Sequence, residues 1–198
     1  MTLLRHLVLL SALLIFSGCE TLGGWFDDEE EDATAPVVLK PIDTSVNLSR
    51  RWKTSIGNGQ GKGFYKLTPV LTGKRLYVAA ENGRVAAIDA ESGNREWQID
   101  LDRPISGGVS FADDRLYLGG SDGSILQLDA VDGSLLWEAV VSGEVLAPPA
   151  VIGNVVIVQT YDGKLMAFDL GSEYPKWTYA SDLPILTLRG TSTPLLLG

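Results

Sequence analysis

The stretch DAESGNREW, residues 89–97, decides the fold because it returns 40 residues later as DAVDGSLLW, residues 129–137. The aspartate, the glycine and the tryptophan keep their spacing in both copies. A third copy, DLGSEYPKW at residues 169–177, keeps the first and last of these but has lost the alanine and the glycine. A fixed period of this length is the signature of a repeat architecture.

Other positions follow the same 40-residue interval. The repeated positions are Trp97, Trp137 and Trp177; Gly83, Gly123 and Gly163; and Asp89, Asp129 and Asp169. Tyr77 and Tyr117 share the interval, and Ile157 takes the third place. Several coincident series of this kind indicate three copies of one structural unit.

Each unit reads as four short strands. In the first unit these are residues 69–71, 75–80 and 84–89, followed by a strand that carries the tryptophan. The pairs Asn82-Gly83, Asp122-Gly123 and Asp162-Gly163 predict two-residue type I′ hairpins, in which both central residues have positive φ. The repeated aspartates are expected to cap the turn before the fourth strand.

Four antiparallel strands in about 40 residues are typical of a β-propeller blade. Strands such as 155–158, VVIV, are apolar on both faces, as expected between two neighbouring sheets. The fold class is therefore all-β, a propeller with about three blades in this chain. The repeat D-A-x-x-G-x-x-x-W resembles the quinoprotein-like (PQQ-like) propeller repeat; the Gly-His and Trp-Asp signatures of the WD40 repeat are missing.

The first 18 residues are typical of an export signal, with Arg5 before an apolar core at residues 7–16. Phe16-Ser17-Gly18-Cys19 resembles the bacterial lipobox, which implies that Cys19 carries acyl chains such as palmitate. Stable anchoring to a bilayer needs two or more chains. Glu20 after the cysteine implies, by the same resemblance, sorting to the outer membrane, facing the periplasm. The alternative is an ordinary signal peptide with an incidental cysteine.

The organisation expected after the signal is a lipidated acidic tether at 19–45 and a partial propeller at 46–198. Within it we expect a closing strand at 46–57, around Trp52, blades at about 64–101, 105–141 and 145–181, and the start of another blade at 191–198. Propellers close with about four to eight blades, so we expect this chain to be the N-terminal part of a longer protein, with eight blades in all.

Several kinds of chemistry are disfavoured by the residue content. The formal charge is −9, but from Ala33 onward 18 acids face 15 bases, so a basic footprint for nucleic acid is absent. The only histidine, His6, lies in the signal, and Cys19 is the only cysteine. We expect no catalytic residues, no metal and no cofactor. The glycine-rich run 57–63 lacks the spacing of a phosphate-binding loop and reads as a flexible loop.

The signal, the acidic tether and the repeats together resemble the BamB family of lipoproteins of the outer-membrane β-barrel assembly machinery. The segment LPILTLRGTSTP, residues 183–194, contains Leu186-Thr187-Leu188-Arg189-Gly190, which matches a motif of that family. The resemblance implies a non-catalytic scaffold that binds the periplasmic domains of BamA through Leu186, Leu188 and Arg189, with unfolded outer-membrane proteins as further clients.

Two other functions compete with the scaffold: a quinone-dependent dehydrogenase and an outer-membrane sensor lipoprotein that binds a small ligand in the central channel. The dehydrogenases of this fold typically carry adjacent cysteines beside the cofactor, which this sequence lacks. For LPILTLRGTSTP the alternative is that its leucines only cover the rim of the third blade.

Overall fold

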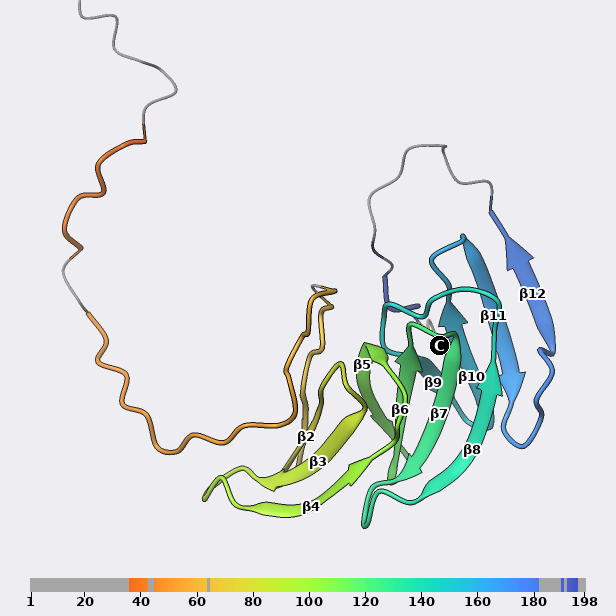
Figure 1. The fold of residues 1–198 in the computed structure, drawn as a ribbon, viewed down its shortest axis with the longest axis horizontal. Coiled ribbons are helices and arrows are strands. Elements are labelled where there is room, and N and C mark those ends of the chain that lie inside the picture. Colours follow the sequence, from red (N-terminus) through yellow and green to blue (C-terminus); the bar gives the residue numbers. More distant parts are fainter. Residues whose placement is uncertain (1–35, 43–44, 64, 182–189, 191, 196–198) are drawn as a thin grey trace, which may run out of the picture. The chain divides into compact units, whose positions relative to one another are not determined.

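The computed structural model describes residues 36–42, 45–63, 65–181, 190 and 192–195. The chain divides into two compact units, Met1–Leu48 and Ser49–Gly198. In the first unit, the described residues contain no helix or strand. The second unit contains three four-stranded antiparallel sheets, which confirms the all-β blades predicted from the repeat (Figure 1).

Each sheet is built from consecutive strands in their order along the chain. Blade 1 contains β1 (Val70–Thr72), β2 (Arg75–Ala79), β3 (Arg84–Asp89) and β4 (Arg95–Asp100). Blade 2 contains β5 (Ile105–Ala112), β6 (Arg115–Gly120), β7 (Ser124–Asp129) and β8 (Leu135–Val140). Blade 3 contains β9 (Ala150–Ile152), β10 (Val155–Gln159), β11 (Lys164–Asp169) and β12 (Trp177–Ala180).

The hydrophobic core lies between the blades. One buried cluster joins Tyr77 and Val85 of blade 1 to Leu116 and Leu118 of blade 2. A second joins Tyr117 of blade 2 to residues of blade 3 that include Val156, Val158 and Phe168. Successive side chains of a strand point to opposite faces of its sheet. Leu116, Tyr117 and Leu118 therefore serve two interfaces, as the two-sided apolar pattern predicts.

The hairpins between the second and third strands differ from the predicted type I′ turns. Gly83, Gly123 and Gly163 have φ of 87°, 85° and 85°, but the preceding Asn82, Asp122 and Asp162 are not among the residues with positive φ. The amide of Gly83 donates to Ala80 O, and that of Ala80 to Arg84 O. The prediction is thus wrong: this is a three-residue loop, a type I turn followed by a left-handed glycine.

A two-residue turn with both φ positive occurs instead at Asp113-Asp114, with φ of 49° and 56° between the paired residues Ala112 and Arg115. Aspartate tolerates the left-handed region better than most residues. The sequence signal was therefore present, but it lacked the glycine that usually reveals such a turn.

The loop at 57–63 is hydrogen-bonded to the hairpin of blade 1. Asn58 Oδ1 accepts from the Asn82 amide at 3.1 Å, Asn58 Nδ2 donates to Glu81 Oε2 at 2.6 Å, and the Glu81 amide donates to Gly59 O at 2.8 Å. These contacts hold the segment over the turn between β2 and β3. The loop is therefore a structured connection instead of the flexible loop that its glycines suggest.

Candidate interaction site

The proposed anchor and the proposed partner-binding residues lie outside the described residues. This holds for Cys19 and for Leu186, Leu188 and Arg189. Of LPILTLRGTSTP, the structure describes Gly190 and residues 192–194. The roles of these four side chains remain predictions.

Two of the repeated tryptophans connect a blade to the next one. Trp97 Nε1 of blade 1 donates to Ala130 O of blade 2 at 3.2 Å, and Trp137 Nε1 of blade 2 donates to Ser172 O of blade 3 at 3.0 Å. Both acceptors lie in the turn that follows the repeated aspartate. Each indole thus packs a large apolar surface between two sheets while its N–H group keeps a partner.

Trp52 makes the same contact although residues 45–56 form no strand. Its Nε1 donates to Ala90 O of blade 1 at 3.0 Å. The segment therefore occupies the position from which a preceding blade would contact blade 1. Its role as a closing strand stays a prediction, since no paired strand for it lies among the described residues.

The indoles of Trp52 and Trp97 each pack against a glycine of the next repeat, which gives that glycine a role besides the turn. A Cβ built on Gly93 would lie 2.6 Å from the ring of Trp52, and one on Gly133 would lie 2.9 Å from the ring of Trp97. Both glycines also have positive φ. The sequence contains a signal for this contact, because tryptophan and glycine recur together, but a glycine at this position is equally explained by the turn alone.

The aspartates of the first two repeats organise these turns. Asp89 Oδ1 accepts from the amide and the hydroxyl of Ser92, at 2.7 and 2.6 Å, and these bonds hold the pKa of its carboxyl below the ordinary value. Asp129 Oδ1 accepts from the Val131 amide at 2.8 Å. Asp169 instead accepts from Lys176 Nζ at 3.0 Å. The aspartate of the third turn thus has a different hydrogen-bond partner, in the copy of the repeat that has lost the alanine and the glycine.

Blade 3 presents an aromatic face that no described residue covers. Trp177 is 42% exposed and Tyr179 is 63% exposed, whereas Trp137, at the equivalent position of blade 2, is 9% exposed. Trp177 and Tyr179 lie two residues apart on β12 and so share one face of the sheet. This face is the counterpart of the one that blade 2 buries against blade 3.

A groove of about 680 Å³ runs along the first strands of the blades. Its lining includes Lys66 and Thr68 before β1, Ser110 and Phe111 of β5, and Pro148 before β9. Ser192 and Thr193, in the described part of LPILTLRGTSTP, line it as well. The groove is the place to test for the small ligand of the sensor alternative.

The described part of the chain contains no group of three His, Cys, Asp or Glu side chains that could hold a metal ion. Nor does it contain a helix long and apolar enough to cross a membrane.

The stacked four-stranded blades and their tryptophan contacts define a β-propeller of the PQQ-like repeat class. The model of the family described as "Outer membrane protein assembly factor BamB" matches residues 47–105 and 81–198. The chain therefore belongs to the BamB family.

Individual relatives agree with this assignment. The chain is 33% identical over 199 residues to the outer membrane protein assembly factor BamB of Yersinia pestis, covering 95% of this chain and 49% of that protein. It is 35% identical to that of Alteromonas naphthalenivorans, covering 94% and 49%. The crystal structure of BamB from Moraxella catarrhalis matches with a TM-score of 0.61 and 28% identity over 66% of this chain and 40% of that chain. The chain spans about half the length of these curated relatives.

Proposed function

We propose that the chain is part of a non-catalytic scaffold lipoprotein of the outer-membrane β-barrel assembly complex, which assists the assembly and insertion of outer-membrane proteins. The observation that carries this proposal is the family match over residues 47–198, because relatives of that family are named outer-membrane protein assembly factors. A stack of blades joined by structural tryptophans suits a scaffold, since the blades offer large surfaces to other proteins.

The scaffold forms a larger ring in this proposal. Its support is the aromatic face of blade 3, where Trp177 and Tyr179 repeat a pattern that blade 2 buries. A further blade would cover them and give the indole N–H a carbonyl acceptor. Expected bounds are the closing segment at 46–57, blades at about 64–101, 105–141 and 145–181, and the start of another at 191–198.

The proposed anchor is the acylated Cys19, which holds the protein on the outer membrane, facing the periplasm. Replacing Cys19 with alanine should leave an unprocessed or soluble periplasmic protein, because the residue that would be acylated is gone. Membrane fractionation of the wild type and the Cys19→Ala variant tests this. Wild-type protein in the soluble periplasm would contradict the proposal.

The proposed partner is BamA, bound through its periplasmic domains by Leu186, Leu188 and Arg189. Leucines two apart in an extended segment face the same way and can be desolvated together. The planar arginine side chain can bind a carboxylate or backbone carbonyls. Unfolded outer-membrane proteins are proposed as further clients of the complex.

Co-purification of BamA with the full-length protein tests the partner. Arg189→Ala, and separately Leu186→Ser with Leu188→Ser, should abolish co-purification and leave the unfolding transition in place. Arg95→Ala and Ile152→Ser are matched controls, because both residues are exposed and lie outside the segment. BamA retained by the variants, or lost equally in the controls, would assign the segment a purely structural role.

A further inference from the structure

The outer strands of the blades differ at four positions that the repeat makes equivalent. These positions lie in the turn before the outer strand and along that strand, and all of them are exposed in all three blades. They are Glu91, Arg95, Glu96 and Asp100 in blade 1; Val131, Leu135, Leu136 and Val140 in blade 2; and Gly171, Pro175, Lys176 and Ala180 in blade 3. The blade 2 set is named the β8 rim.

The β8 rim does not contribute to the core. Val131, Leu135, Leu136 and Val140 are 63%, 50%, 46% and 60% exposed. Trp137 and Ala139, on the same strand, are buried in the cluster shared with blade 3. Single exposed apolar residues are ordinary. Here three lie on β8 and the fourth, Val131, lies in the turn before it, whereas all four equivalent residues of blade 1 are charged. A group of exposed apolar residues of this kind is typical of an interaction surface.

The backbone of β8 is available for pairing. In its sheet β8 bonds only to β7, so the other side of the strand is an edge (Figure 1). Natural edge strands are usually protected by charged side chains or proline. The only charged residue of β8 is Glu138, which is bound by Arg103 Nη2 at 2.6 Å. An unprotected edge with exposed apolar side chains is suited to accept an added strand.

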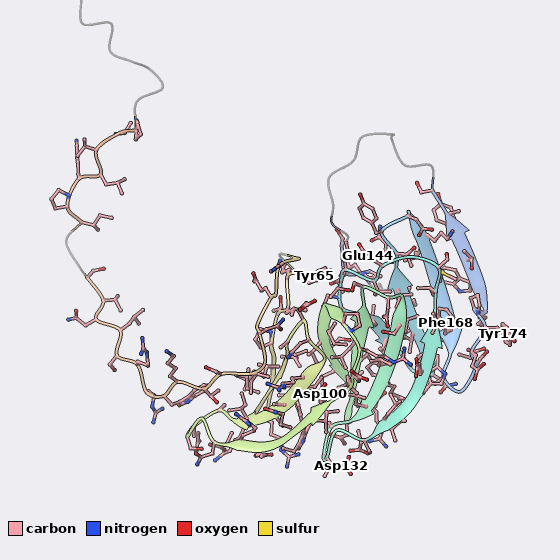
Figure 2. All side chains as sticks on the ribbon, viewed as in Figure 1. Tyr65, Asp100, Asp132, Glu144, Phe168 and Tyr174 are labelled. Atoms are coloured by element: carbon pink, nitrogen blue, oxygen red, sulfur yellow. The ribbon has the colours of Figure 1, made fainter. Side chains whose placement is uncertain are left out.

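Unpaired negative charge lies beside this edge. A depression of about 420 Å³ is lined by Glu138, Ala139 and Val140 of β8 and by Glu173 and Tyr174 of the turn before β12. Tyr174, which is 80% exposed, marks this turn in Figure 2. Among the described residues, Glu173 takes part in none of the salt bridges.

The charge restricts the occupant. An anionic membrane surface would be repelled by the free carboxylate. A two-fold dimer through this surface would place the same acidic groups of both copies near each other. A partner with apolar side chains and a lysine or arginine would complement both the β8 rim and the free carboxylate of Glu173.

We propose that the β8 rim and the adjoining acidic depression bind an extended segment of another protein. The segment adds a strand to β8, lays its apolar side chains on the rim and places a lysine or arginine near Glu173. This surface is separate in sequence from Leu186, Leu188 and Arg189, and the proposal does not depend on the role of those residues.

Binding of designed peptides to the full-length protein tests the proposal. The probe is a fluorescent ten-residue peptide of alternating valine and threonine with one central lysine. The matched probes carry glutamate in place of the lysine, or proline at alternate positions to remove the backbone donors. Fluorescence anisotropy should show saturable binding of the lysine peptide and at least tenfold weaker binding of both matched probes.

Variants locate the site. Val131→Glu, Leu135→Arg, Leu136→Glu and Val140→Asp together give blade 2 the rim of blade 1 and should weaken binding at least tenfold. Glu173→Gln should weaken binding of the lysine peptide severalfold and reduce its salt dependence. Ile152→Ser, at an exposed apolar residue outside the rim, should bind as the wild type does. All variants should keep the wild-type unfolding midpoint, because every changed side chain is exposed.

Three results would overturn the proposal. One is equal binding by the wild type and the four-residue variant. Another is binding of the proline peptide as tight as that of the lysine peptide, because no strand would then be added. The third is absence of peptide binding together with self-association that the four-residue variant abolishes, which would make the rim a contact between copies.

Discussion

Blade 2 and blade 3 have the same strand order but very different burial. Most residues of β6 and β7 in blade 2 are buried, whereas the equivalent β10 and β11 are only partly buried and β12 is exposed throughout. Blade 2 has a described neighbour on both faces, and blade 3 has one on a single face. A blade therefore obtains its core from its neighbours, so the stability of this fold depends on the interfaces more than on any sheet alone.

The largest expected effect concerns the exposed face of blade 3. We expect residues 46–198 alone to unfold with low cooperativity and to aggregate, because the face with Trp177 and Tyr179 and the free edges are exposed. A chain extended to the length of its relatives should unfold sharply. Denaturant titration followed by tryptophan fluorescence and light scattering compares the two. A sharp, reversible transition of the shorter chain as a monomer would contradict this expectation.

Alanine substitutions at the equivalent tryptophans of blades 2 and 3 test how much the difference in burial contributes to stability. Trp137→Ala should lower the free energy of unfolding of this 198-residue chain by about 3–5 kcal/mol, the usual cost of deleting a buried aromatic side chain. Trp177→Ala should cost about 1 kcal/mol or less, since the side chain is 42% exposed. Urea unfolding of both variants measures the difference.

In the full-length protein the same two substitutions should have similar effects if a further blade covers Trp177. A persistently small effect of Trp177→Ala there would mean that its face stays open, and the proposed larger ring would be wrong at this interface.

Much of this fold could be predicted because the repeat preserves residues with structural roles. The 40-residue interval predicted the three blades, and the strands with two apolar faces predicted the packing between neighbouring blades. The contact of Trp52 with blade 1 was expected only as part of a closing strand. The turn types were less predictable, because Asn82-Gly83 fits both a two-residue type I′ turn and a three-residue loop with a left-handed glycine.

The candidate sites were predictable to different degrees. Cys19 and the Leu186–Arg189 segment come from a short motif and a family resemblance, and they lie outside the described residues. The β8 rim was missed because Val131 or Leu136 looks like an ordinary strand residue in sequence. The β8 rim is distinguished from ordinary strand residues only by the exposure of its side chains and by the charged residues at the equivalent positions of blade 1.

Two glycines with positive φ give a smaller test, which separates a close backbone contact within a blade from the strain of the turn itself. A Cβ on Gly123, in blade 2, would lie 2.1 Å from Val141 O, and φ is 85°. Gly123→Ala should therefore cost about 2–4 kcal/mol, from backbone strain together with the clash. Gly153→Ala, in blade 3, should cost about 1–2 kcal/mol, because φ is 54° but nothing lies within 4 Å. Equal costs, measured by thermal unfolding, would show that strain alone decides.

The smallest expected effect is a pH dependence at the hairpin of blade 3. Asp162 accepts hydrogen bonds from Lys164 Nζ and Thr160 Oγ1, and these hold the pKa of its carboxyl below the ordinary value of 3.8. Lys164 Nζ also donates to Ser142 Oγ at 3.0 Å, which ties the hairpin to the connection after blade 2. The folded state therefore binds the proton less tightly than the unfolded state does. The resulting stability is present above pH 3.8 and is lost as the pH falls through the lowered pKa.

Asp162→Asn should consequently reduce stability at neutral pH and flatten its decline in acid, because asparagine does not titrate. The matched substitution is Asn82→Asp in blade 1, where Arg84 stands two residues later as Lys164 does in blade 3. It should introduce a small acid-dependent stabilisation, limited because Arg84 already pairs with Asp100 at 3.5 Å. Urea midpoints measured from pH 3 to pH 7 compare the two variants with the wild type. If Asp162→Asn leaves the shape of this profile unchanged, the carboxylate does not contribute to acid sensitivity, and the difference between the two hairpins has no consequence for stability.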